Sequence, residues 1–260
     1  MVPLVDENRI LVFYGLQVLR KTYRTGLLEL FNKLRIKKEN IMEDDIGFLI
    51  APRINIASRM EHANTSYQLL TTPSSEEAGW IVNRLDGLNV DRRKIVDEIL
   101  LEIDNRIKNQ KEKPILIVEG DLSWNIGVLG LTANRLLEKY NCPVFLWGKG
   151  DLENIKGSSR SDGSINLVEL MDKTGKEFFV ESGGHAFSAG FTAVENKIDF
   201  LKEALLKAFS KIKKEEIEDF IWIDKEEGLN NLDWNFLETV EKFGPFGKDN
   251  SKPLFLFKDI

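Results

Sequence analysis

Apolar residues recur every three or four positions over much of the chain, which is the spacing of one buried helix face. This spacing predicts two helices near the start, over residues 8–20 and 25–36. It then runs unbroken from Pro73 to about residue 110, and Ser74 and Glu77 at its start are spaced as a capping pair. At about 1.5 Å per residue such a helix measures roughly 45–50 Å. We interpret it as a strut between two lobes; a coiled-coil seam is the alternative, but the spacing departs from a strict heptad.

After Pro114 the pattern changes to short apolar runs that alternate with helical segments. The predicted order is strand 115–118, helix 126–140, strand 143–147, helix 165–171, strand 189–194 and helix 200–212. This order predicts a small α/β domain whose strands are mostly parallel.

Two further strands are expected beyond this domain, over residues 220–223 and 253–257. The second is apolar and aromatic and lies at the end of the chain. Such a strand needs a partner, and we expect that partner to be absent from the chain.

Composition places the chain among globular proteins with a real core, since 42% of its 260 residues are hydrophobic. The single cysteine, Cys142, excludes an internal disulfide and is expected to be buried and inert. Neither a membrane-spanning stretch nor a leader segment is recognisable, so we expect no membrane partner and a cytoplasmic location.

The net charge of −6 argues against a protein that coats nucleic acid by bulk attraction. Its distribution is uneven. Residues 1–60 carry ten Lys and Arg against seven Asp and Glu, whereas residues 215–241 carry one Lys against ten Asp and Glu. A polyanion is therefore expected to favour the first segment and avoid the last.

Two expected loops have the composition of a phosphate-binding surface. Arg53, Asn55 and Arg59 place two guanidinium groups among small residues, a pattern that fits a sugar–phosphate backbone. Trp124 precedes a predicted helix start, where backbone N–H groups attract anions and the indole can stack on a base. The alternatives are exposed arginines at a helix start and a tryptophan that seals a loop.

Two later segments add stronger candidates. Ser158 and Arg160 alternate in an extended segment and so share one face, where a hydroxyl and a guanidinium can grip a terminal phosphate. Gly183 and Gly184 allow backbone N–H groups to converge on an anion, and His185 can donate to a phosphate or leaving oxygen. The alternative is a pair of turns with a satisfied histidine and a solvated arginine.

A metal-dependent hydrolytic centre needs several carboxylates and histidines that converge on divalent ions. The sequence contains two histidines and one dense acidic cluster before the terminal region, Glu43, Asp44 and Asp45. Three adjacent carboxylates point in different directions, so we interpret the cluster as a solvated loop. No metal site is expected in this chain.

Taken in order, these motifs resemble the RecJ-type single-strand-specific exonucleases of the DHH phosphoesterase superfamily. The resemblance runs from end to end. The segments that carry it are Val2–Leu4 with Glu7–Arg9, Ala51–Arg59, Leu88-Asn89 with Arg92, Trp124–Gly130, Lys156–Ser161, Gly183–Gly190 and Pro245–Phe255.

This chain departs from the family pattern at several positions. Asn125 replaces a usual histidine, Ile56 and Ser58 replace alanine and glycine, and Arg93 occupies a frequent glutamine position. The metal-binding DHH domain has no counterpart in the sequence, and the OB-fold stops near its start.

The resemblance implies four parts: a helical region over 1–72 that follows the DHH domain, a connecting helix over 73–110, a DHH-associated substrate-binding domain over 111–213 and the start of an OB-fold over 217–260. The fold class is therefore α/β: a helical connector with a strut helix, a small mixed α/β domain and an incomplete β segment.

The resemblance also implies a role in DNA repair and recombination. Mn²⁺ or Mg²⁺ in the absent domain activates water, and this chain holds single-stranded DNA across the cleft. Ser158 and Arg160 then anchor the 5′ phosphate, Arg53 and Arg59 hold the backbone, and His185 contacts the scissile phosphate. The expected partners are single-stranded DNA, the DHH domain in the same or a separate chain, and a single-strand-binding protein or a helicase.

Two other functions remain open at this point. One is a stand-alone single-strand-binding module without catalysis. The other is a phosphodiesterase for short oligonucleotides, whose compact relatives are not expected to carry the segment Pro245–Gly247.

Overall fold

The computed structural model describes residues 2–109, 112–150, 154–212 and 220–258, and these form two compact units. One unit consists of residues 1–89 and 219–260, and the other of residues 90–218. The long helix α5 (Ser75–Lys108) contributes its first half to one unit and its second half to the other. Residue 110 of the predicted helix and residues 217–219 of the predicted last segment lie outside the described residues.

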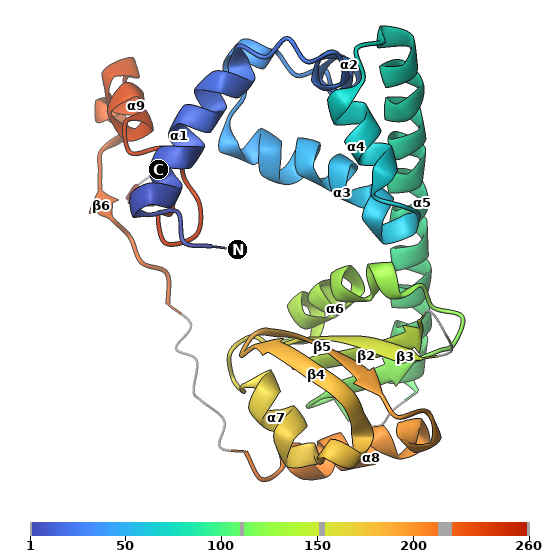
Figure 1. Cartoon of the computed structure of the whole chain (residues 1–260). Helices are drawn as coiled ribbons and strands as arrows, with labels where there is room; N and C mark the ends of the chain where they lie inside the picture. Colours follow the sequence, from blue (N-terminus) through green and yellow to red (C-terminus); the bar gives the residue numbers. More distant parts are fainter. Residues whose placement is uncertain (1, 110–111, 151–153, 213–219, 259–260) are drawn as a thin grey trace. The chain divides into compact units, whose positions relative to one another are not determined.

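The first unit is mainly helical (Figure 1). Its helices are α1 (Asp6–Arg20), α2 (Thr25–Leu34), α3 (Ala51–Met60), α4 (Asn64–Thr71), α9 (Trp234–Glu241) and the first half of α5, with short helical segments at Lys38–Asn40, Asp45–Ile50 and Leu229–Asn231. The predicted helices 8–20 and 25–36 are confirmed to within two residues at each end. The capping pair is also confirmed, because the backbone N–H of Glu77 donates to the Ser74 hydroxyl at 3.2 Å.

The core of this unit explains why these segments are helices. Helices α1 to α4 and the first half of α5 each contribute an apolar stripe, and burying those stripes against one another removes them from water. The fully or nearly fully buried members are Leu30, Phe31, Ile41, Ile50, Ile56, Ala57, Leu69, Ala78, Ile81, Val82 and Leu85.

Contacts far apart in sequence tie the end of the chain to its beginning. The backbone N–H of Leu4 donates to the carbonyl of Lys248 at 2.6 Å, and Arg9 donates to the carbonyl of Phe243 at 2.9 Å. The acidic cluster takes part as well, since Glu43 accepts from the backbone N–H of Phe246 at 2.8 Å. The interpretation of this cluster as a merely solvated loop was therefore wrong.

The predicted strand over residues 220–223 was also wrong. That segment forms no strand, and the short pair β6 (Lys225–Glu226) and β7 (Phe255–Leu256) forms instead, in parallel register. The terminal strand thus has a partner within the described residues. An apolar run alone does not specify a strand, because strand geometry is stabilised by cross-strand pairing rather than by the residues themselves.

The second unit is a five-stranded sheet with helices on both faces (Figure 1). Its strands are β1 (Ile117–Gly120), β2 (Val144–Lys149), β3 (Ile155–Arg160), β4 (Phe179–His185) and β5 (Ser188–Ala193), in the order β1-β2-β3-β5-β4. Its helices are α6 (Ile126–Tyr140), α7 (Leu167–Thr174), α8 (Ile198–Phe209) and the second half of α5, with short helical segments at Lys176–Phe178 and Glu195–Lys197.

The sheet is mixed, which corrects the expectation of mostly parallel strands. Only β1 and β2 pair in parallel, while β2–β3, β3–β5 and β5–β4 are antiparallel. The predicted strand order contained neither β3 nor β4, although the segment around Ser158 was expected to be extended, because Ser and Gly occupy positions where a typical strand carries β-branched residues.

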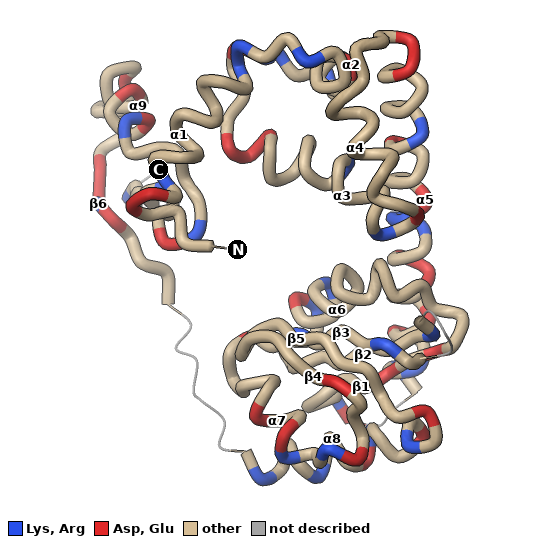
Figure 2. The backbone as a smooth tube through the Cα atoms, in the orientation of Figure 1, with Lys and Arg blue, Asp and Glu red and all other residues tan. Residues whose placement is uncertain are grey.

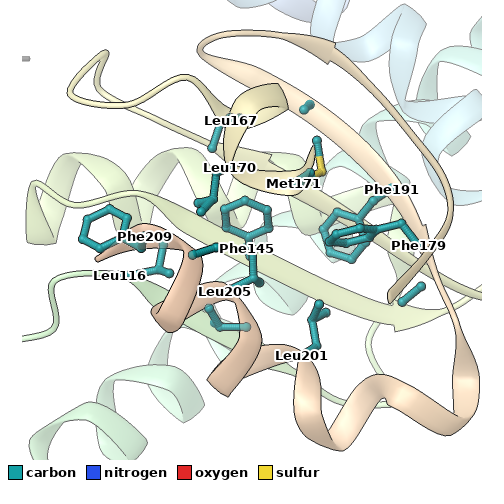
Figure 3. Packing of buried hydrophobic residues seen from close by; sticks show 14 of the residues in the cluster. Leu116, Phe145, Leu167, Leu170, Met171, Phe179, Phe191, Leu201, Leu205 and Phe209 are labelled. Carbon is teal, nitrogen blue, oxygen red and sulfur yellow. The ribbon is translucent and has the colours of Figure 1, made fainter. Parts of the chain in front are cut away.

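The two sheet faces are covered differently. On one face α7 and α8 bury an aromatic and aliphatic core, in which Phe145 of β2 lies close to Phe191 of β5, with ring centroids 5.9 Å apart (Figure 3). On the other face α6 packs on β2 and β3, whereas Ser188 and Gly190 of β5 and Gly183 and His185 of β4 stay exposed. Cys142 is buried and free, as predicted.

Helix α6 is held against the second half of α5 by polar contacts. Arg135 donates to Asp97 at 2.6 Å, and the Tyr140 hydroxyl donates to Asp104 at 2.7 Å. Burial and the hydrogen bond to Asp104 raise the pKa of Tyr140 to about 12. Although burial alone has the opposite effect, hydrogen bonds from Lys139 and Tyr140 lower the pKa of the Asp104 carboxyl.

No helix among the described residues is long and apolar enough to cross a membrane.

Candidate nucleic-acid interface

Three strands of the second unit bring Arg160 and His185 into one row. Arg160 of β3 pairs with Ser188 of β5, and Ser188 pairs with His185 of β4. Residues paired across neighbouring strands lie on the same sheet face. The guanidinium, the hydroxyl and the imidazole therefore share the face on which α6 packs, although 25 residues separate Arg160 from His185 in the sequence.

The next row on this face carries almost no side chains. Ser158 pairs with Gly190, and Gly190 pairs with Gly183. A β-carbon on Gly183 would meet nothing within 4 Å, and one on Gly190 would meet only the carbonyl oxygen of Gly157 at 3.7 Å. The result is an open floor of exposed backbone, which we call the glycine floor (Gly183 and Gly190), beside the Ser158 hydroxyl.

Gly184 has a different role from its neighbour. Its φ of +143° lies in a region that L side chains rarely adopt, and a β-carbon there would approach the carbonyl oxygen of Ser188 to 2.5 Å. The residue is therefore required for the hairpin that joins β4 and β5 and so positions His185. It faces the opposite side of the sheet from the glycine floor.

The Arg160 side chain lies along its own strand rather than extending into solvent. Its Nη1 donates to the Ser158 hydroxyl at 3.0 Å and to the Ser159 carbonyl at 2.7 Å. These two contacts fix the plane of the guanidinium, and its fork is chemically suited to phosphate oxygens. The predicted pairing of Ser158 with Arg160 is thus present as a direct contact.

Helix α6 packs against this contact between Arg160 and Ser158. Gly130 faces Arg160 and Ser158 so closely that a β-carbon on it would lie 2.8 Å from Arg160 Nη2 and 3.2 Å from the Ser158 hydroxyl oxygen. At the start of α6 the Asn125 side chain accepts from the backbone N–H of Gly127 at 2.8 Å, as an N-cap does.

Trp124 does not offer an open ring, which corrects its expected role in stacking on a base. The side chain is buried, its indole N–H donates to Glu102 at 3.0 Å, and the Arg106 guanidinium lies 5.2 Å from the ring centroid. Trp124 therefore fastens the loop before α6 to helix α5. The structure matches the alternative of a tryptophan that seals a loop.

Arg106 of α5 contacts both Trp124 and the end of strand β1. It donates to Glu119 at 3.1 Å and to the carbonyl of Gly120 at 3.2 Å. Despite its partial burial, the hydrogen bonds to Glu119 and Glu102 raise its pKa. Hydrogen bonds from Ser123 lower the pKa of Asp121 in the same loop.

The other predicted site residues lie in the first unit. Residues 53–59 were expected to form a loop, but they belong to helix α3, with Pro52 in its first turn. Pro is compatible with that position because the first backbone N–H groups of a helix have no intrahelical acceptor. Asn55 and Arg59 are four residues apart and both exposed, so they share one outward face.

Arg53 points elsewhere. It is half-buried, its Nε lies 3.3 Å from Asp86 of α5, and its Nη1 donates to the carbonyl of Leu49 at 3.0 Å. The structure thus separates the expected trio into an exposed pair and an arginine that joins α3 to α5.

Ser188 was absent from the sequence-based candidates, and Gly130 and Gly190 were included only as parts of longer motifs, with no role of their own. Alternation along Ser188–Ala193, where Ala189, Phe191 and Ala193 are buried, is the signal that places Ser188 and Gly190 on the open face. The contact of Gly130 with Arg160 and Ser158 had no such signal, because only the packing of α6 on β3 reveals it. Figure 2 shows that β5 carries no charged residue. The permanent positive charge of the row is that of Arg160 on β3.

Within the described ranges, the structure has no group of three or more His, Cys, Asp or Glu side chains that could hold a metal ion. The residues present therefore do not fit a divalent-metal centre.

Residues 112–211 match the family model of the DHHA1 domain. The single-stranded-DNA-specific exonuclease RecJ of Bacillus subtilis is 31% identical over 100% of this chain and 33% of its own length. The RecJ of Thermus thermophilus is 31% identical over 98% of this chain and 36% of its own length.

This chain is homologous to part of RecJ.

The fold leads to the same relatives. The crystal structure of Thermus thermophilus RecJ with Mn²⁺ superposes with a TM-score of 0.77 and 28% identity, covering 98% of this chain and 37% of that one. A second RecJ structure bound to manganese has a TM-score of 0.65 and 30% identity, over 81% of this chain and 52% of that one. The chain spans between a third and a half of the length of the curated RecJ relatives that it matches along nearly its whole length.

Proposed function

We propose that this chain is the strand-binding part of a RecJ-type 5′-to-3′ single-strand exonuclease, and that Arg160 with Ser158 holds the 5′ phosphate of the DNA. The observation that carries the proposal is the direct contact of these two side chains, 3.0 Å apart, beside an exposed backbone floor. A phosphate placed there meets a guanidinium fork and a hydroxyl together, and charge-assisted contacts of this kind are the strongest hydrogen bonds available.

The row from Arg160 to His185 supports an extended contact with the strand. His185 is exposed at the end of β4 and lies in register with Ser188, so its imidazole can donate to a phosphate beyond the terminal one. Asn55 and Arg59 on the exposed face of α3 are suited to further backbone contacts. Anchoring an end while cutting near it gives an exonuclease its polarity.

The hydrolytic step belongs to a part that this chain does not supply. RecJ structures have been solved with Mg²⁺ and with Mn²⁺, and such ions activate water for attack on a phosphodiester. The described residues of this chain hold no matching ligand cluster. Its own contribution is to bind, orient and discriminate the strand.

The decisive experiment measures binding of the 260-residue chain to two otherwise identical single strands, one with a 5′ phosphate and one with a 5′ hydroxyl, by fluorescence anisotropy. We expect tighter binding of the phosphorylated strand, and we expect Arg160→Ala to remove that preference by weakening the phosphorylated complex about 10- to 100-fold. Equal losses on both strands would show that Arg160 does not sense the end.

A second candidate is a stand-alone single-strand-binding module, favoured by the absence of a metal cluster among the described residues. The two are separated by supplying a DHH domain from a RecJ relative as a separate chain with Mn²⁺. Strand degradation that requires both chains supports the exonuclease, whereas unchanged binding without degradation supports the module.

A further inference from the structure

We propose that Gly130 is a positioning residue for the end sensor: the missing side chain at this position of α6 is what allows the Arg160 guanidinium to lie flat beside Ser158 and select a 5′-phosphorylated strand. This inference rests on the proposed function of Arg160 and extends it to a residue that touches no substrate.

The space between Gly130 of α6 and the Arg160 guanidinium is too small for a side chain. A β-carbon on Gly130 would lie 2.8 Å from Arg160 Nη2, a separation that real β-carbons essentially never show, and 3.2 Å from the Ser158 hydroxyl oxygen. Even one methyl group at this position therefore cannot coexist with the observed guanidinium. Any larger side chain conflicts with it further.

A side chain at position 130 would displace the Arg160 guanidinium and not the backbone. The atom in the way is the far end of a long, flexible side chain and not backbone, so the guanidinium can move while α6 and β3 keep their places. Gly148 of β2 is the contrasting case, because a β-carbon there would meet the backbone carbonyl oxygen of Trp124 at 2.5 Å. Alanine at Gly148 disturbs the fold, whereas alanine at Gly130 disturbs Arg160.

Glycine inside a helix has a cost in stability. Gly130 lies inside the 15-residue helix α6, where glycine is a poor helix former relative to alanine. Its presence opposes local helix stability, and the structure offers one compensation, the close approach to Arg160 and Ser158. A residue that is unfavourable locally and fits a site sterically is the pattern expected of a functional position.

The consequence for binding follows from the contacts that Arg160 makes. The hydrogen bonds from its Nη1 to the Ser158 hydroxyl and to the Ser159 carbonyl hold the guanidinium along β3. A methyl group on residue 130 displaces the fork from both contacts. The positive charge then stays nearby, but the two-pronged geometry for a terminal phosphate is lost.

The test uses Gly130→Ala in the 260-residue chain, with Gly87→Ala as the matched control. Gly87 is also a helical glycine, in α5, but a β-carbon on it meets nothing within 4 Å. Both variants are expected to keep or raise the unfolding temperature. Gly130→Ala alone is expected to reduce the ratio of Kd values for 5′-hydroxyl and 5′-phosphorylated strands by about tenfold, leaving the Kd for the 5′-hydroxyl strand unchanged.

A double-mutant cycle makes the claim specific. In an Arg160→Ala background, adding Gly130→Ala is expected to change the preference no further, because the side chain through which Gly130 acts is gone. Independent, additive losses would contradict the inference. This readout does not depend on the absolute stability of either variant.

The outcomes separate this inference from the proposed function. If Arg160→Ala abolishes the 5′-phosphate preference and Gly130→Ala does not, the positioning role is wrong while the end sensor stands. If Arg160→Ala leaves the preference intact, the end sensor itself is wrong. If Gly130→Ala lowers the unfolding temperature as Gly148→Ala is expected to do, the glycine is structural and the inference is overturned.

Discussion

The indole nitrogen of Trp124 donates to the Glu102 carboxylate across 3.0 Å, and this bond joins the loop before α6 to helix α5. The same loop places the α6 N-terminus, and α6 in turn covers Arg160. A hydrogen bond between two residues about twenty positions apart in the sequence therefore helps to position the helix that packs against the proposed phosphate site.

Trp124→Phe tests this fastening. The substitution keeps an aromatic ring for Arg106 to contact but removes the donor to Glu102, so we expect the free energy of unfolding to fall by about 1–3 kcal/mol. Chemical denaturation followed by circular dichroism measures the change. The double variant with Glu102→Gln serves as the control, because its loss is expected to be smaller than the sum of the two single losses. Full additivity would show that the bond does not contribute.

The paired glycines at the end of β4 are expected to respond differently to alanine. Gly184→Ala forces a β-carbon to within 2.5 Å of a backbone oxygen at a φ of +143°, so it is expected to lower stability by more than about 1 kcal/mol. Gly183→Ala adds a methyl group to open space, so stability is expected to stay near wild type while single-strand binding weakens. Thermal unfolding and anisotropy titrations, made on both variants, check the two effects. Similar behaviour of the two would contradict the assignment of separate roles.

Helix α3 gives a similar contrast between two arginines. Arg59→Ala is expected to weaken single-strand binding about equally for 5′-phosphate and 5′-hydroxyl strands and to lower the salt dependence of the association constant by about one phosphate contact. Arg53→Ala removes a half-buried partner of Asp86 and is expected to reduce the stability of the first unit. Binding titrations over a range of salt concentrations, with unfolding measured in parallel, separate these outcomes. Loss of stability in Arg59→Ala would refute its placement on a solvent-facing surface.

The alkaline stability of the second unit is expected to depend on Tyr140. Its folded pKa is raised from 10.0 to about 12, so folding favours the protonated phenol. The resulting stabilisation is fully present below pH 10 and is lost as the pH rises through about 12. Unfolding free energies measured from pH 8 to 12 are expected to fall more steeply for the wild type than for Tyr140→Phe. Parallel curves would show that the phenol does not carry this pH dependence.

The sequence alone predicted helices α5 and α6 and the shared face of Ser158 and Arg160. Helix α6 starts and ends where its apolar spacing predicts, and α5 lies within two residues of its predicted ends, because helical hydrogen bonds are local and the apolar stripe records which face is buried. Alternation likewise put Ser158 and Arg160 on one face before any partner strand was known.

Tertiary structure decided everything that depends on pairing between distant segments. The antiparallel register of β3, β5 and β4 placed His185 in the row of Arg160, and no local pattern contains that register. Packing buried Trp124, turned Arg53 toward Asp86 and brought Gly130 over the guanidinium. Such relations arise only when the chain folds back on itself, since steric fit and strand pairing are properties of two surfaces in contact.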